Sequence, residues 1–393
     1  MYLISVWLAQ GAFDQRSIER ILGSLAAKLS TQVQLSTGGA RSLAFSRAVK
    51  QGRSMARPQR LPEDCRDALA AGRGLLTTAS LRNAGVSSRQ LARLLDRNVM
   101  IGVAKGVYAD AAAYRALEPW PRFALRTRAF VAASPPDAIA ADWSAVALHR
   151  LPATREPPSV PSVIRPTPRR SGSNRTCHGR TRYAAVRDRW IAQIDDVAVF
   201  APAMAAVDLA RHVEQWRALA LADAAANKAG SNGSLMTVLN DMSLWPGIAR
   251  ARWSVEHADP DAESPLESAG RCAFIHAHLP IPLSNVWVGE RYPLFRLDHY
   301  WVEQRLAAEA DGMGKYLIGD NAAVVLRREK DRELWLEAHG IRVIRYTWAL
   351  ATRYPQVLAE RCRERLSEPM TPARGEIRWW PSRTGSAMLR GAP

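Results

Sequence analysis

Three carboxylates in the last third of the sequence have a spacing that could hold a metal ion. Asp298 precedes Glu309 by eleven positions, and Asp311 follows two residues later. If Glu303-Gln304 is a two-residue hairpin turn, counting outward from it places Asp298 directly opposite Glu309, on one face of the sheet. Asp311 shares that face because side chains alternate along a strand. Clustered carboxylates repel each other unless a cation joins them, and oxygen ligands of this kind suit Mg²⁺.

The surrounding sequence predicts the elements that position these carboxylates. Ser264 and Pro265 start a helix that carries Glu267 in its first turn. Two strands, 295–301 and 305–311, form the hairpin. A charged helix from about Leu326 ends at His339-Gly340, and IRVIRYTW follows as a buried strand.

This order of acidic residues, charged helix and VIRYTW-type strand resembles the Vsr-like branch of the PD-(D/E)XK nucleases, over about a hundred residues. The resemblance implies a restriction-endonuclease-like mixed sheet with helices on both sides. It also implies that Asp298 and Glu309 hold Mg²⁺, which activates water and offsets charge on the phosphate being cut. Glu267 matches the helix-borne glutamate of the family, which contacts the metal site through water.

One position departs from the family pattern. The wider superfamily has a lysine two residues after the glutamate, and here that position is Asp311. Lys315, in GMGKY, stands where the Vsr-like branch has a His or Lys, and Lys330 is a second candidate. The alternatives are a degenerate nuclease site and a hairpin whose acidic face is merely solvated.

The composition indicates a polyanionic partner. The 393 residues include 54 Lys and Arg against 37 Asp and Glu, a net charge of +17, which favours nucleic acid over a membrane. No run approaches the roughly 20 apolar residues of a membrane span. The four cysteines form no CxxC pair, which argues against a zinc module or a disulfide framework and fits a reducing cytoplasm.

The segment from Glu63 to Asp110 predicts a helix-turn-helix with a wing. Gly85 ends one short helix, and Ser87 or Ser88 caps the next. On that second helix, every fourth residue of one face is basic and a leucine face is buried. The leucines are Leu91, Leu94 and Leu95, and the expected DNA contacts are Arg89, Gln90, Arg93, Arg97 and Lys105 at the turn of the wing. The alternative is a small helical domain with a solvated arginine face.

The stretch GLLTTASLRNAGVSSRQLARLLDRNVMIGVAKGVYAD resembles the winged-helix domain that opens AbiEi-type antitoxins of toxin–antitoxin systems. In that family the winged helix binds operator DNA and represses its own operon, which implies double-stranded DNA and a cognate toxin protein as partners. The segment APAMAAVDLAR, from Ala201 to Arg211, resembles the domain that connects this winged helix to a nuclease-like domain.

The predicted architecture is therefore an α+β multidomain chain. Its parts are a basic, disordered extension over 1–60, a winged helix-turn-helix over 61–115, an α/β connecting domain over 116–258, a Vsr-like nuclease-fold domain over 259–366 and an open tail over 367–393. Within the connecting domain, the arginine-rich stretch from Arg165 to Arg189 contains Pro, Gly and Ser and predicts a loop.

Three functions are compatible with these patterns. The first is a cytoplasmic DNA endonuclease that depends on Mg²⁺. The second is a non-catalytic, AbiEi-type antitoxin and transcriptional autoregulator with a degenerate nuclease fold. The third is a protein-interaction factor that neutralises a toxin, for which no residue gives direct support. Both leading hypotheses predict salt-dependent DNA binding, and only the first predicts cleavage.

Overall fold

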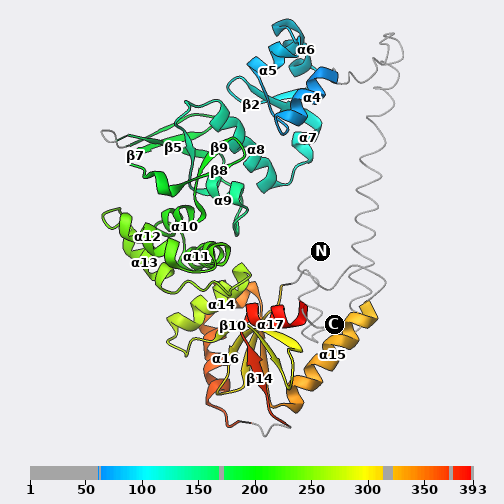
Figure 1. Ribbon diagram of the computed structural model, residues 1–393, viewed down its shortest axis with the longest axis vertical. Helices are drawn as coiled ribbons and strands as arrows, with labels where there is room; N and C mark the ends of the chain where they lie inside the picture. Colours follow the sequence, from blue (N-terminus) through cyan, green and yellow to red (C-terminus); the bar gives the residue numbers. More distant parts are fainter. Residues whose placement is uncertain (1–60, 62, 168–171, 313–321, 371–374, 391–393) are drawn as a thin grey trace, which may run out of the picture. The chain divides into compact units, whose positions relative to one another are not determined.

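Figure 1 shows a computed structural model of the chain, which describes residues 61, 63–167, 172–312, 322–370 and 375–390. These residues hold three β-sheets with helices around them, a mixed α/β architecture with separate hydrophobic cores. The basic extension expected over 1–60 lies outside them. In the described part of the chain, no helix has both the length and the apolar character to cross a membrane.

The amino-terminal part combines short helices with a three-stranded sheet of order β1-β3-β2. Helix α6 starts where the sequence predicts, because the Ser87 hydroxyl accepts the N–H of Gln90. Thr77, which the sequence analysis did not name, caps the preceding helix in the same way. The elements are α4 (Glu63–Ala71), β1 (Leu76–Thr77), α5 (Thr78–Asn83), α6 (Ser88–Asp96), β2 (Met100–Ala104), β3 (Val107–Asp110) and α7 (Ala111–Ala116).

The middle part has a six-stranded mixed sheet, of order β6-β7-β5-β4-β9-β8, and a group of packed helices. The alanine-rich helices α10 and α11 are buried along most of their length. The elements are α8 (Pro119–Ala132), β4 (Ile139–Ala140), α9 (Trp143–His149), β5 (Ser162–Pro166), β6 (Gly172–Arg175), β7 (Arg180–Ala184), the 3₁₀ turn η1 (Asp188–Trp190), β8 (Ile191–Ile194), β9 (Val197–Phe200), α10 (Pro202–Ala210), α11 (Gln215–Ala229), α12 (Gly233–Asp241) and α13 (Ile248–Glu256).

The arginine-rich stretch is not the loop that its composition predicts. Most of its described residues belong to strands: β6 and β7 pair with each other, and β7 also pairs in parallel with β5. Tertiary context overrides the turn-forming composition here. Arg182 is anchored by an ion pair with the buried Asp208, and Gly179 packs so closely on Phe130 that an added Cβ would lie 2.3 Å from its ring.

The carboxyl-terminal part is a five-stranded sheet, of order β13-β12-β11-β10-β14, with helices on both sides. Helices α14 and α16 pack on one face around Phe274 and Tyr346, and α15 packs on the other around Leu336; Figure 1 shows α15 and α16 on opposite sides. The elements are α14 (Pro265–His276), β10 (Leu283–Gly289), β11 (Phe295–Trp301), β12 (Leu306–Ala310), α15 (Ala322–Ala338), β13 (Arg342–Tyr346), the π-helix η2 (Ala349–Arg353), α16 (Pro355–Ser367), β14 (Arg378–Trp380) and α17 (Ser382–Arg390).

The segment after residue 367 is not an open tail throughout. Strand β14 adds to the edge of the sheet, with Trp379 opposite Val288 and Trp380 opposite Trp287. The indole N–H of Trp287 donates to the Ser386 hydroxyl on α17 at 3.2 Å. Two adjacent tryptophans that cover a strand edge explain why this segment is ordered.

Candidate functional site

The hairpin of β11 and β12 has the register that the sequence predicts. His299 pairs with Ala308, Tyr300 with Ala307 and Trp301 with Leu306. These pairs confirm the register counted outward from Glu303-Gln304. The bend closes with the N–H of Arg305 donating to the carbonyl of Val302 at 3.2 Å.

Asp298 and Glu309 stand one position beyond the last of these pairs. The Asp298 carboxylate accepts the backbone N–H of Ala310, the residue after Glu309, at 2.8 Å. A side chain of β11 is thereby tied to the backbone of β12 at the point where the ladder ends. This hydrogen bond fixes the Asp298 carboxylate next to Glu309.

Glu309 is an enclosed carboxyl group with a nearby cation. Its buried Oε1 lies 2.8 Å from Nη2 of Arg332 on α15, and the two groups form an ion pair. Burial raises the pKa of Glu309 to about 7, Arg332 opposes this shift, and the charge of Asp298 adds to it. Glu309 therefore titrates near neutral pH.

Glu267 joins the same cluster from the first turn of α14, which Ser264 caps. Its Oε2 accepts the N–H of Glu263 at 2.9 Å and the side-chain amide of Asn285, on β10, at 2.6 Å. Burial raises the pKa of Glu267, and the Asp298 charge contributes in the same direction. Asp298 therefore interacts with both glutamates.

A neutral aromatic pair lies beside the three carboxylates. The Tyr346 hydroxyl is 2.8 Å from Nε2 of His299. Burial, followed by the charges of Asp298 and Glu267, raises the pKa of Tyr346 well above its usual value. Burial also lowers the pKa of His299 to about 3, so neither ring carries a charge at neutral pH.

The other residues predicted for this site, Asp311, Lys315 and Lys330, make no contact with Glu309 that the described residues show. Asp311 follows β12, and its backbone N–H donates to the carbonyl of Tyr346 at 2.8 Å. Lys315 lies outside the described residues. Lys330 is exposed on α15. The cation that meets Glu309 is Arg332, which the sequence analysis did not single out.

The donor chemistry of the cluster suits a hard divalent cation, because its groups are carboxylates. The buried Oε1 of Glu309 lies 2.8 Å from the Arg332 guanidinium, so a bound cation would share this carboxylate with Arg332. In the described part of the chain, no three His, Cys, Asp or Glu side chains already stand close enough together to enclose one ion.

Helix α6 exposes the basic face that the sequence predicts. Leu94 is buried, and Leu91 and Leu95 pack against the same core, as expected. Arg89, Arg93, Arg97 and Lys105 are exposed, with Lys105 at the turn between β2 and β3. Gln90 belongs to the cap of the helix: its side-chain oxygen accepts the N–H of Ser87 at 2.8 Å.

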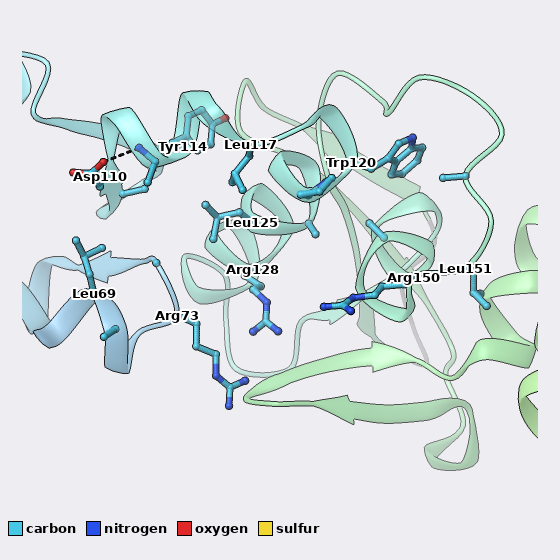
Figure 2. A pocket seen from close by; sticks show the side chains of 18 residues that line it. Leu69, Arg73, Asp110, Tyr114, Leu117, Trp120, Leu125, Arg128, Arg150 and Leu151 are labelled. Atoms are coloured by element: carbon cyan, nitrogen blue, oxygen red, sulfur yellow. Dashed lines mark hydrogen bonds between the residues drawn. The ribbon is translucent and has the colours of Figure 1, made fainter. Parts of the chain in front are cut away.

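A cavity of about 800 Å³ opens between the amino-terminal and middle parts, and its lining includes none of the predicted site residues. Figure 2 shows an apolar wall that contains Leu117, Trp120 and Leu125, with Arg73 and Arg128 nearby. Both arginines form ion pairs with Asp195.

Comparison with known proteins does not assign the chain to a family. No family model matches it. Two uncharacterized proteins from two strains of Mycobacterium tuberculosis are each 35% identical over 115 residues, which is 29% of this chain and 42% of each relative. The chain therefore spans less than half the length of these relatives.

Among solved structures, the RV2827C protein from Mycobacterium tuberculosis matches 50% of this chain and 78% of its own at 16% identity. The TM-score is 0.34, which is too low to establish a shared fold.

Proposed function

We propose that the chain binds double-stranded DNA and that its carboxyl-terminal part is a Vsr-like PD-(D/E)XK endonuclease domain. One observation carries this proposal: the Asp298 carboxylate is held beside Glu309 by the Ala310 N–H, and its charge acts both on Glu309 and on Glu267 from α14. Desolvated carboxylates that repel each other need a cation to remain ionised. The mixed sheet with helices on both faces is the frame that the resemblance implies.

Asp298 and Glu309 would hold Mg²⁺, which when bound supplies water activation and charge neutralisation on the phosphate. The protein itself positions those two groups. The Ala310 N–H holds the Asp298 carboxylate, and Asn285 together with the Glu263 N–H holds Glu267. Arg332, whose Nη2 lies 2.8 Å from Oε1 of Glu309, would take the place of the missing family lysine.

The amino-terminal part supplies the DNA-binding surface of the proposal. Short helices α5 and α6 followed by the β2–β3 hairpin have the order of a winged helix-turn-helix. In this arrangement α6 enters the major groove, and Arg89 and Arg93 contact phosphates or base edges. Lys105, at the tip of the hairpin, contacts the backbone beside it.

The proposal is tested by plasmid nicking in the presence of Mg²⁺. Wild type should convert supercoiled plasmid to the open circle, and EDTA should abolish this conversion. Asp298→Asn and Glu309→Gln should bind DNA normally but lose cleavage by about a hundredfold or more. Glu303→Gln, at an exposed position in the hairpin turn, is the matched control and should cleave like wild type.

One observation favours a second function, a non-catalytic regulator of the antitoxin type. The Arg332 guanidinium already lies beside Glu309 and neutralises part of its charge, so the cluster could persist as a structural remnant. Duplex binding without cleavage in either Mg²⁺ or Mn²⁺ would select this function, with a toxin protein as the expected partner.

A further inference from the structure

A second cavity, of about 600 Å³, lies in the middle part and has a strongly basic lining. Four arginines line it: Arg155, Arg175, Arg180 and Arg182. Asp142 is the acidic residue among the lining residues. His212 also lines the cavity, and burial lowers its pKa, so its ring is neutral at pH 7. Four arginines therefore line the space together with one carboxyl group.

Among these four arginines, Arg182 is the one that forms ion pairs with carboxylates of the described residues, and the charge of Arg180 also acts on Asp142. Nη2 of Arg182 lies 2.5 Å from Asp208 and 3.3 Å from Asp142. Arg175 donates to the Ser159 hydroxyl at 2.9 Å, and Arg155 stacks on the Trp143 ring at 5.5 Å from its centroid. Neither of these, nor Arg180, forms an ion pair with a carboxylate of the described chain.

The strand register brings two exposed like charges together. Arg175 and Arg180 are direct partners across β6 and β7. Like charges at directly opposed positions of an antiparallel pair destabilise it. Arg182 lies two positions along the same strand and therefore on the same face. A doubly charged anion between them would reverse the sign of this interaction.

The wall behind these arginines is fixed in place. Asp142 has φ 52° and ψ −141°, a backbone conformation that L-residues rarely adopt. Its carboxylate accepts the Ser162 hydroxyl at 2.8 Å. Asp208 is fully buried and also pairs with Arg211. The Arg182 guanidinium is thus held between two carboxylates, while Arg175 donates to a neutral hydroxyl and forms no ion pair within the described residues.

We propose that this cavity binds a phosphoryl group, with Arg175 and Arg180 as its main contacts. The forked guanidinium donors match phosphate oxygens in pairs, and a volume of about 600 Å³ is large enough for a nucleotide. The phosphoryl group is carried either by a small phosphorylated molecule or by a nucleic acid backbone. The inference does not depend on the acidic cluster, because no residue of that cluster lines this cavity.

The test uses the full chain and the double variant Arg175→Ala/Arg180→Ala. Affinity is measured by calorimetry for inorganic pyrophosphate and by fluorescence anisotropy for a 20-base-pair duplex, both at low salt. The control double variant Arg66→Ala/Arg252→Ala also removes two positive charges, at exposed positions outside the cavity. Circular dichroism and the thermal unfolding midpoint verify that each variant is folded.

A loss of pyrophosphate affinity of tenfold or more in the Arg175→Ala/Arg180→Ala variant, with the control near wild type, supports a small phosphorylated ligand. A similar loss confined to the duplex assigns the phosphates to nucleic acid. The proposal is overturned if the folded Arg175→Ala/Arg180→Ala variant binds both probes as tightly as the control does. Cleavage of plasmid is not a readout here, so failure of the nuclease proposal leaves this result unaffected.

Discussion

The Asp298 carboxylate accepts the backbone N–H of Ala310 at 2.8 Å and so joins β11 to β12 where their ladder ends. This contact keeps a charged side chain beside Glu309, whose pKa burial and Asp298 both raise. A surface carboxylate that only made the protein more soluble would extend into water. Here it is directed across the strands toward another acid.

The first prediction concerns this contact. Asp298→Ala leaves the Ala310 N–H without its acceptor and should lower the free energy of unfolding by about 1–3 kcal/mol. Asp298→Asn keeps an acceptor oxygen and removes the repulsion with Glu309, so it should be clearly more stable than the alanine variant. Urea unfolding in EDTA measures both, and equal stability of the two would show that the hydrogen bond contributes nothing.

A second prediction follows from the pKa of Glu309, which rises from 4.5 to about 7 on folding. Because the folded form holds its proton more tightly, ionisation of Glu309 destabilises the protein as pH rises from 4.5, and the full penalty is reached above pH 7. The limit is about 3 kcal/mol. Glu309→Gln in EDTA should therefore gain stability over wild type at pH 8 and lose that gain near pH 4.5.

The control for this pH profile is Glu337→Gln, at an exposed position on the same helix as Arg332. Its difference from wild type should not change across the same pH range. A flat profile for Glu309→Gln as well would mean that Glu309 is ionised at neutral pH in the folded protein.

The third prediction concerns α6. Arg89→Ala and Arg93→Ala should each weaken duplex binding and reduce the salt slope by about one unit for each phosphate that the variant no longer neutralises. Arg66→Ala, at an exposed position on α4, should leave both unchanged. Anisotropy titrations between about 50 and 200 mM salt, where phosphate contacts dominate binding, give these slopes. Wild-type slopes for both variants would remove α6 from the interface.

The fourth prediction concerns the buried ion pairs of the middle part. Asp208 has no exposed surface and pairs with Arg182 and Arg211. Asp208→Asn removes the charge that both arginines need and should cost about 3–5 kcal/mol of stability. Asp188→Asn, at an exposed position in η1, should cost little. Chemical denaturation distinguishes the two, and a mild effect at Asp208 would show that solvent reaches the pair.

The elements with strong local signals could be predicted from the sequence. Ser264 and Pro265 start α14, and the alternation around Glu303-Gln304 defines the register of the hairpin, because capping and strand pairing depend on neighbouring residues. The leucine face of α6 follows from helical periodicity for the same reason.

Contacts between distant elements could not be predicted in this way. Arg332 meets Glu309 because α15 packs over the sheet, and nothing in the local pattern distinguishes it from the other charged residues of that helix. The strand β7 pairs with β5 and β6, and its Arg182 meets Asp208, 26 residues further along the chain. The edge strand β14 depends on pairing with β10. Each of these features depends on tertiary contacts, which composition alone does not predict.

The central claim is that Asp298 and Glu309 together bind a divalent cation, and calorimetric titration of the metal-free protein with Mn²⁺ tests it most directly. Wild type and Glu303→Gln should bind one ion with equal affinity at pH 8, and Asp298→Asn and Glu309→Gln should each bind at least tenfold more weakly. Wild-type protein that takes up no ion, or that binds it no better than Glu309→Gln does, would contradict the claim.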